Sequence, residues 1–451
     1  PPCSRPGRPD CATSAARSAP PVNAPVERSV GALLGACLAD LGVTGLWGGA
    51  LPGLAERGGH SDDLDRLFAD AEGRLGPGPG AALVADGRTL HLSTKPGGDR
   101  YRYTILEVGE LPEAVALWHM HGFPATYELE LALDLEAPAP PELGPVPMGV
   151  DRTVPVLDPS LADEQVVIVA GPDVIRSGAT ASLATAASRA AAGVLNTWGA
   201  KGVFRWDDPR HHGTFGLQAR DLELSGIADA GLIIATGIDP LELPPGGLGS
   251  GLVLEVPPTQ LTALVHHWPD PTRPVPPPPP LYQNLSLALA PLYRSEGMPL
   301  APPRAAADLA ETTPPGGVVV ADPGEAGLWV ARTFPTRTPE SVLVPATVSP
   351  GFAAAASYVG TRLGRPALGV TATPVDEVTP QVLDLARSEG AEVALVVWDE
   401  EAAPLADVAD HPRLLRSLWE DSGVRVRHVP VDLDKLSVLT GVAGPVTAFA
   451  G

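Results

Sequence analysis

The sequence predicts an α/β protein with three domains, each a mainly parallel β-sheet covered by helices. Three observations lead to this fold class. At about 150 residues per domain, a chain of 451 residues corresponds to about three domains. Short, fully apolar segments of strand length alternate with helical patterns, as expected for parallel strands that are buried on both faces. Two proline-rich clusters, 137–147 and 269–280, divide the chain.

These clusters predict the domain boundaries. Polyproline extends by about 3.1 Å per residue and forms a semi-rigid spacer. We therefore expect a Pro/Ser/Arg-rich disordered leader at 1–25, a first domain at 26–136 and a second domain at 150–268. A proline-rich linker at 269–280 then leads into a third domain at 281–451.

Helix and strand patterns occur in each block. In the first block, apolar residues from Val30 to Leu41 follow the i, i+3, i+4, i+7 rule, and Gly42 is a natural helix end. The second block predicts strands at 166–170 and 231–236, with an alanine-rich helix at 180–192 after the first of them.

The third block predicts buried strands at 317–321 and 393–398. Between them, Thr379 is a candidate helix N-cap, Pro380 suits the first helical position and Gly390 suits the C-terminal stop. In open parallel sheets, ligands bind at the carboxyl ends of strands where the strand order reverses.

Composition excludes several classes of partner. A formal net charge of −22 argues against nucleic acid and against an anionic membrane, since both require a basic surface. No run approaches 18 apolar residues, so we expect no membrane span and a cytoplasmic protein. The cysteines, Cys3, Cys11 and Cys37, form neither a disulfide framework nor a metal site.

The middle block carries a recognisable series of motifs. Gly199–Gly202 is followed by Pro209, Gly213 and Gly216, and then by Ala228–Ala230 leading into a strand that ends at Gly237. Their order and spacing over about 70 residues resemble the central domain of thiamine-diphosphate (ThDP) dependent enzymes of the acetolactate synthase and decarboxylase type.

The flanking blocks resemble the other two domains of that family more weakly. Gly42-Val43 followed by Leu46–Gly48 is similar to the start of the pyrimidine-binding (Pyr) domain. Asp322–Gly324 and Ser349–Ala353, which includes Gly351, resemble strand-end and helix-start motifs of the diphosphate-binding (PP) domain. The resemblance implies a Pyr-like, central and PP-like arrangement. It also implies a homodimer or homotetramer with ThDP between the first domain of one subunit and the third domain of another.

The resemblance further implies a glutamate in the first domain that activates the aminopyrimidine ring. Glu72 is the candidate at about the right distance, although GRLGPGPG follows where a small-residue helix is expected. Matching 81–87 to that helix instead places the glutamate position on Gly78. Without the family, 81–93 reads as a β-hairpin with Asp86-Gly87 as a type I′ turn, and this is the interpretation we favour.

Magnesium in this family is held by Gly-Asp-Gly after a strand and by a later Asn. Here Ala372, Thr373 and Pro374 stand at the first motif, and Trp398 and Asp399 at the second. Asp399, or Asp376 as a replacement ligand, remains as a candidate metal ligand. Proline also removes an N–H donor and the freedom that glycine gives the loop.

Two further features of the middle block are a candidate nucleotide site and a pair of histidines. Ser177-Gly178 precedes a helix, and Arg176 beside it would suit a diphosphate; because some relatives hold FAD or ADP in the central domain, a nucleotide site stays open. His211 and His212 lie in the loop of the recognised motif. We expect them on the surface, and the alternative is that they face a ligand at a domain boundary.

Three functions follow from these observations. The first is a divergent family member, a pseudoenzyme with weakened or lost ThDP–Mg²⁺ binding, that serves as a small-molecule binding or partner subunit. The second is an active ThDP-dependent carboligase or decarboxylase acting on 2-oxo acids. The third is a nucleotide-binding module centred on the middle domain.

Overall fold

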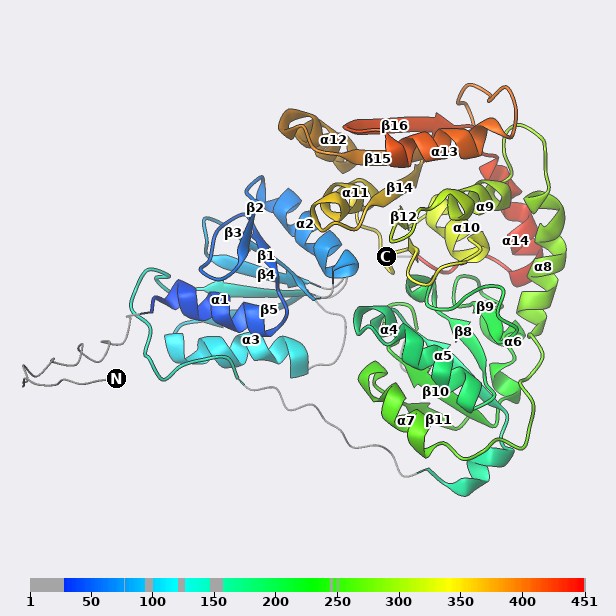
Figure 1. The fold of residues 1–451 in the computed structure, drawn as a ribbon, viewed down its shortest axis with the longest axis horizontal. Helices are drawn as coiled ribbons and strands as arrows, with labels where there is room; N and C mark the ends of the chain where they lie inside the picture. Colours follow the sequence, from blue (N-terminus) through cyan, green and yellow to red (C-terminus); the bar gives the residue numbers. More distant parts are fainter. Residues whose placement is uncertain are drawn as a thin grey trace, which may run out of the picture.

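The computed structural model describes residues 28–76, 78–93, 100–120, 126–146, 157–243, 246–249 and 251–449. The predicted leader, 1–25, lies outside them. The predicted fold class is confirmed: three α/β layers, each with its own sheet, follow one another along the chain (Figure 1). None of the described helices is long and apolar enough to cross a bilayer.

The first sheet mixes parallel and antiparallel pairs. Its order is β2-β1-β3-β4-β6-β5, with antiparallel ladders between β3 and β4 and between β4 and β6. The strands are β1 (Gly45–Trp47), β2 (Ala55–Gly58), β3 (Gly80–Val84), β4 (Thr89–Ser93), β5 (Arg100–Ile105) and β6 (Thr126–Leu131). Helices α1 (Val30–Asp40) and α3 (Leu111–Met120) cover one face, and α2 (Asp62–Leu75) covers the other.

The hairpin interpretation of 81–93 is confirmed. β3 and β4 pair from Gly80↔Ser93 to Val84↔Thr89. In the turn, Asp86 and Gly87 both have positive φ, and the Arg88 N–H donates to the Ala85 carbonyl, as a type I′ turn requires.

The second sheet is entirely parallel, in the order β11-β10-β7-β8-β9. Its strands are β7 (Val166–Ala170), β8 (Gly193–Asn196), β9 (His211–Thr214), β10 (Leu232–Thr236) and β11 (Val253–Glu255). Helices α5 (Thr180–Arg189) and α7 (Leu261–His267) pack on one face, and the short helices α4 (Asp173–Arg176) and α6 (Asp221–Leu224) follow strands. The opposite face packs against the third domain.

The third sheet is also parallel, in the order β13-β12-β14-β15-β16. Its strands are β12 (Val318–Ala321), β13 (Val342–Leu343), β14 (Ala367–Ala372), β15 (Val393–Trp398) and β16 (Val424–Val429). The helices are α8 (Pro280–Tyr293), α9 (Pro302–Thr312), α10 (Glu325–Thr333), α11 (Phe352–Arg362), α12 (Val378–Glu389), α13 (Asp410–Glu420) and α14 (Leu436–Ala443). α11 and α12 cover one face, and α9, α10 and α13 cover the other.

Helix α12 begins two residues before the predicted first position, Pro380. Asp376 accounts for the difference, because its carboxylate accepts the N–H groups of Val378 and Thr379 and thereby caps an earlier start. The predicted end is confirmed, with Gly390 in the left-handed conformation at φ 64°.

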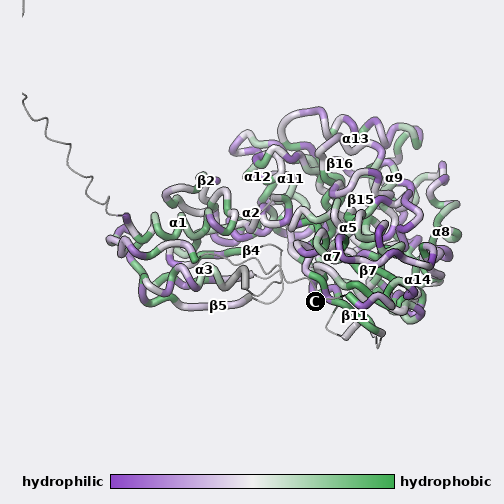
Figure 2. Tube along the Cα trace, turned by 60° about the horizontal axis from the view of Figure 1, so that its bottom comes forward, coloured by the Kyte–Doolittle hydropathy of each residue, from purple (hydrophilic) through white to green (hydrophobic). Residues whose placement is uncertain are grey.

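The three domains share hydrophobic cores. Helix α2 packs against α11, where the rings of Phe68 and Tyr358 stack with centroids 4.7 Å apart. The second and third domains share a larger core that includes Trp198, Phe215 and Trp329. Figure 2 shows long hydrophobic segments within the layers, such as α1, and mainly hydrophilic residues along outer helices such as α13.

Candidate functional site

The strand order of the third sheet predicts where a ligand would bind. Numbered along the chain, its strands run 2-1-3-4-5, so the order reverses between β12 and β14. Ligands of such sheets bind outside the carboxyl ends of the two strands that flank the reversal. A crevice of about 290 Å³ lies there. Its lining includes residues that directly follow each of these strands: Asp322, Pro323, Thr373, Pro374 and Asp376.

Asp322 lies at the base of this crevice. Its Oδ1 accepts the N–H of Ala353 in the first turn of α11 at 2.8 Å. Its Oδ2 is buried and accepts no hydrogen bond from the described residues. Burial raises the pKa of this carboxyl to about 7, although the Ala353 N–H and the Thr371 hydroxyl favour the charged form. Asp322 is thus the one predicted site residue that keeps a free buried oxygen at the crevice.

The carboxylate of Asp376 caps the N-terminus of α12. Oδ1 accepts two backbone N–H groups at 2.8 and 2.9 Å, and Oδ2 accepts the Thr379 hydroxyl at 2.7 Å. Beside it, Ala372 and Pro374 contribute no side-chain oxygen, and Pro374 contributes no N–H. The positions that the resemblance assigns to Gly-Asp-Gly therefore supply one hydroxyl, that of Thr373, in place of a carboxylate.

Asp399 lies outside the crevice lining. It follows β15, and its Oδ2 contacts Nδ1 of His428 on β16 at 2.9 Å, while Oδ1 accepts the N–H of Glu401. The two predicted glycines start helices: Gly324 precedes α10 with φ 121°, and Gly351 precedes α11 with φ 76°. Both helices begin close to Asp322, so the structure brings most of the predicted diphosphate-site residues together but leaves Asp399 apart.

The charge of the crevice is acidic. Asp322, Glu325 and Asp376 line it, and no lysine or arginine does so among the described lining residues. Within the described part of the chain, no group of three or more His, Cys, Asp or Glu side chains converges as a metal site. Mg²⁺ at a diphosphate is typically held by one or two carboxylates together with waters and phosphate oxygens. The two carboxylates that the resemblance offers for this role are engaged elsewhere, Asp376 at the start of α12 and Asp399 with His428, so the residues at the predicted positions do not fit the magnesium–diphosphate group.

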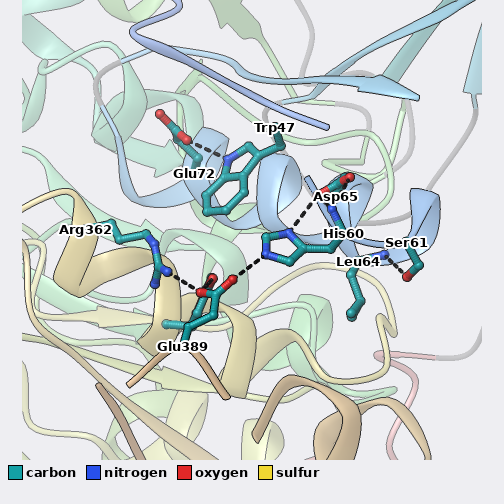
Figure 3. Close-up of polar contacts among 9 residues, drawn as sticks. Trp47, His60, Ser61, Leu64, Asp65, Glu72, Arg362 and Glu389 are labelled. Atoms are coloured by element: carbon teal, nitrogen blue, oxygen red, sulfur yellow. Dashed lines mark hydrogen bonds and ion pairs between the residues drawn. The ribbon is translucent and has the colours of Figure 1, made fainter. Parts of the chain in front are cut away.

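Glu72 is held by contacts within its own domain. Oε2 accepts the indole N–H of Trp47 at 2.8 Å, and Oε1 accepts Arg57 Nη2 at 2.9 Å and the Thr44 hydroxyl at 3.2 Å. Figure 3 shows Glu72 beside Trp47 and His60 lying between Asp65 and Glu389. Both carboxylate oxygens of Glu72 thus have partners, and the side chain is buried.

Arg176 lies at a closed junction between domains, whereas Ser177 is exposed. Arg176 pairs with Asp173 and lines a cavity of about 20 Å³ together with Arg74 and Arg365. A cavity of that volume holds about one water molecule. Burial, with the Arg74 charge adding to it, lowers the pKa of Arg176 to about 9. The nucleotide site thus stays a prediction, and the cavity that Arg176 lines is too small for a nucleotide.

The reversal point of the second sheet is closed as well. It lies between β7 and β10, where Gly171 meets Gly237 so closely that a Cβ on Gly171 would lie 2.1 Å from the Gly237 carbonyl oxygen. The crevice of the third domain and the cavity beside Arg176 have no lining residue in common, so they are separate places.

Comparison with known proteins supports the sequence interpretation of the middle domain. Residues 161–254 match the family model of the thiamine pyrophosphate enzyme central domain. A solved structure, that of a candidate thiamin diphosphate-dependent enzyme isolated from Mycobacterium smegmatis, has the same fold with a TM-score of 0.63 and 16% sequence identity. The alignment covers 90% of this chain and 99% of that one. No curated protein sequence matches the chain.

The prediction that His211 and His212 lie on the surface is wrong. Both are buried, with exposed fractions of 6% and 2%. They lie on β9, the last strand of the second sheet, and this edge is covered by the linker and by α8: Nε2 of His212 lies 3.2 Å from the Pro276 carbonyl oxygen, and the His211 ring packs edge-on against Tyr282. Sequence alone does not show that a polar HH pair will be covered by a distant helix.

Proposed function

We propose that this protein is a divergent member of the ThDP-dependent enzyme family in which ThDP–Mg²⁺ binding is weakened or lost, and that it has a non-catalytic binding or partner role. Kinship is supported by the central-domain match over 161–254 and by the fold. The loss is supported by one observation above all: at the carboxyl end of β14, Thr373 stands where the family resemblance places an aspartate, and the nearby replacement candidate Asp376 is committed to capping α12.

Electrostatic repulsion also disfavours a diphosphate in the crevice. A diphosphate brings negative charge to a place lined by Asp322, Glu325 and Asp376, with no basic side chain among the lining residues described. A cation could offset that charge only if it found enough ligands. Asp376 is committed to the start of α12, and the side chains of Ala372 and Pro374 carry no oxygen. The remaining side-chain oxygens of the lining are the carboxylates of Asp322 and of the exposed Glu325, and the hydroxyls of Ser349, Thr371 and Thr373.

The surroundings of Glu72 give independent support, because the family resemblance assigns the glutamate and the diphosphate to different subunits of a dimer. Each is therefore judged by its own surroundings. An activating glutamate needs a free oxygen for the aminopyrimidine ring, whereas Glu72 is bound by Trp47 and forms an ion pair with Arg57 at 2.9 Å. A structural role for Glu72 explains these contacts without a cofactor.

The test is the thermal stability of the full chain in the presence of ThDP and Mg²⁺, added together and separately at millimolar concentration. A ligand at 100 times its Kd adds about 2.7 kcal/mol of stability. We expect no shift in Tm and no turnover of 2-oxo acids. A rise of several degrees that needs both ThDP and Mg²⁺ would overturn the proposed loss.

Two variants sharpen this test. The triple substitution Ala372→Gly, Thr373→Asp and Pro374→Gly restores the family motif, and a ThDP-dependent rise in Tm in that variant alone would support the crevice as a degraded diphosphate site. Glu72→Gln should lower Tm in the absence of any cofactor, because Arg57 then loses its counter-ion. If Glu72→Gln left Tm unchanged and removed a ThDP response of the wild-type chain, Glu72 would be the activating residue.

A further inference from the structure

A cavity of about 370 Å³ lies between the second and third domains, away from the crevice. One wall is β9 and the segment that includes Lys201; the other is α8 and the end of α10 (Figure 1). Leu281, Leu285 and Leu289 form an apolar stripe along α8, which is completed by Phe334. Cavities of this size and apolar character are typical small-molecule sites.

Lys201 places a charged group inside this cavity. The residue follows the short helical turn Trp198–Ala200, and its exposed fraction is 4%. It lines the cavity, and its ammonium group makes no hydrogen bond or ion pair with any described residue. Burial, with the Arg332 charge adding to it, lowers the pKa of Lys201 to about 7. An unpaired buried lysine is costly unless something compensates its charge.

The protein does not supply that compensation. Arg332 beside it already has a partner in Asp221. His211 carries no negative charge, and burial, with Lys201 and His212 adding to it, lowers its pKa to about 3. Among the cavity-lining residues that are described, there is neither Asp nor Glu, although the whole chain has a net charge of −22.

The mouth of the cavity is basic and aromatic. Arg294 and Arg337 line it, are exposed, and form no ion pair within the described ranges. Trp206 lies with them and is 39% exposed. The lining thus combines an apolar wall, a buried amine and two free guanidinium groups.

We propose that this cavity binds a small organic anion, a monocarboxylate with an aromatic or branched apolar body, whose carboxylate pairs with Lys201 and whose body lies against the leucine stripe of α8. Arg294 and Arg337 attract the anion to the mouth. This site is distinct from the diphosphate crevice and does not depend on whether ThDP binds.

A bound carboxylate favours the charged form of Lys201, so binding takes up a proton near neutral pH. The free amine is half protonated near pH 7, and only the protonated form offers the ion pair. The charged or titratable groups that face Lys201 are positive or neutral near neutral pH: Arg332 on α10, His211 and His212 on β9, Tyr282, Tyr293 and Arg294 on α8, and Arg337. None of these groups would make the binding of a carboxylate stronger as the pH rises from 6 to 8.

The experiment compares two ligands of matched shape, 4-phenylbutyrate and 4-phenyl-1-butanol, by isothermal titration calorimetry on the full chain. We expect the carboxylate to bind at least tenfold more tightly than the alcohol. Lys201→Met should remove that preference, whereas Lys435→Met, at a surface lysine paired with Asp432, should leave it unchanged. Equal affinity for the two ligands, or no binding of either, would overturn the proposal.

The pH dependence gives a second test that needs no variant. If only the protonated lysine binds, the protonated fraction falls from about 0.9 at pH 6 to about 0.1 at pH 8, and the apparent Kd of 4-phenylbutyrate rises about tenfold. Lys201→Arg, which stays charged, should bind with nearly the same Kd at both values. A wild-type Kd that does not change with pH would refute the role of Lys201.

Discussion

Arg332 and Asp221 form a buried ion pair that joins the third domain to the second. Arg332 Nη2 lies 2.6 Å from Asp221 Oδ2, and both side chains are 1% exposed. Arg332 also donates to Oε1 of Gln218 at 3.1 Å, and Asp221 Oδ2 accepts the backbone N–H groups of Leu217 and Gln218. The perturbation we consider is the removal of either charge, by Arg332→Met or by Asp221→Asn.

Breaking one side of a buried pair typically costs about 3–5 kcal/mol, because the remaining charge is left uncompensated. After Arg332→Met, Asp221 keeps its two backbone donors, so the loss should lie near the lower end, about 3 kcal/mol. After Asp221→Asn, Arg332 keeps only neutral acceptors, and the loss should be about 4 kcal/mol. The double variant has no buried charge at this point, and its loss should be about 2 kcal/mol smaller than the sum of the two single losses.

The assay is unfolding in urea, followed by tryptophan fluorescence, on the wild-type chain, both single variants and the double variant. Arg413→Met is the control, because Arg413 pairs with Asp410 on the surface and its removal should leave the midpoint unchanged. If the two single losses were simply additive in the double variant, the ion pair would not be the source of the stability, and the reasoning would be refuted.

Three further predictions concern the crevice and the contact between the first and third domains. Burial raises the folded-state pKa of Asp322 to about 7, so the wild-type chain loses stability as pH rises from about 4 to 7. Asp322→Asn should therefore gain about 4 kcal/mol relative to wild type at pH 8 but little at pH 4, measured by Tm at both values. Gly351→Ala should lower the free energy of unfolding by about 2–3 kcal/mol, since the φ of Gly351 is 76° and a Cβ would lie 2.9 Å from Val378. The control Gly364→Ala, with φ 68° and open space around it, should lower it by only about 1 kcal/mol. Equal melting temperatures of the two variants would contradict the steric argument. Hydrogen bonding to Asp65 raises the pKa of His60, which also contacts Glu389. The contribution of His60 to folding stability is therefore present below pH 6.5 and is lost as pH rises through the folded-state pKa. His60→Ala should lower Tm more at pH 5.5 than at pH 8.5.

Local sequence patterns were enough to predict several individual elements in each of the three domains. The apolar runs at 166–170 and 393–398 form strands with those bounds, and the type I′ turn at Asp86-Gly87 is present. The start of α12 was missed by two residues, because the side chain of Asp376 caps the helix and the periodicity of its apolar residues does not record that contact. The order of the central-domain motifs carried the family resemblance, which the match over 161–254 supports.

The candidate site was predictable in part. The carboxyl ends of parallel strands lie at one edge of a sheet, so Asp322 and the 372–374 segment could be expected near one another, and they line one crevice. Asp399 follows the next strand but contacts His428 instead, which depends on the partner that β16 brings to it.

By itself, the sequence determined the α/β class and the positions of several strands, because these follow from short-range patterns of polarity, glycine and proline. The tertiary structure alone decided that Glu72 is bound by Trp47 and Arg57, that His211 is buried, and that Lys201 lies in a cavity lined by α8 with no partner among the described residues. The charge state and accessibility of these groups depend on side chains tens to hundreds of residues away, and only folding brings those side chains together.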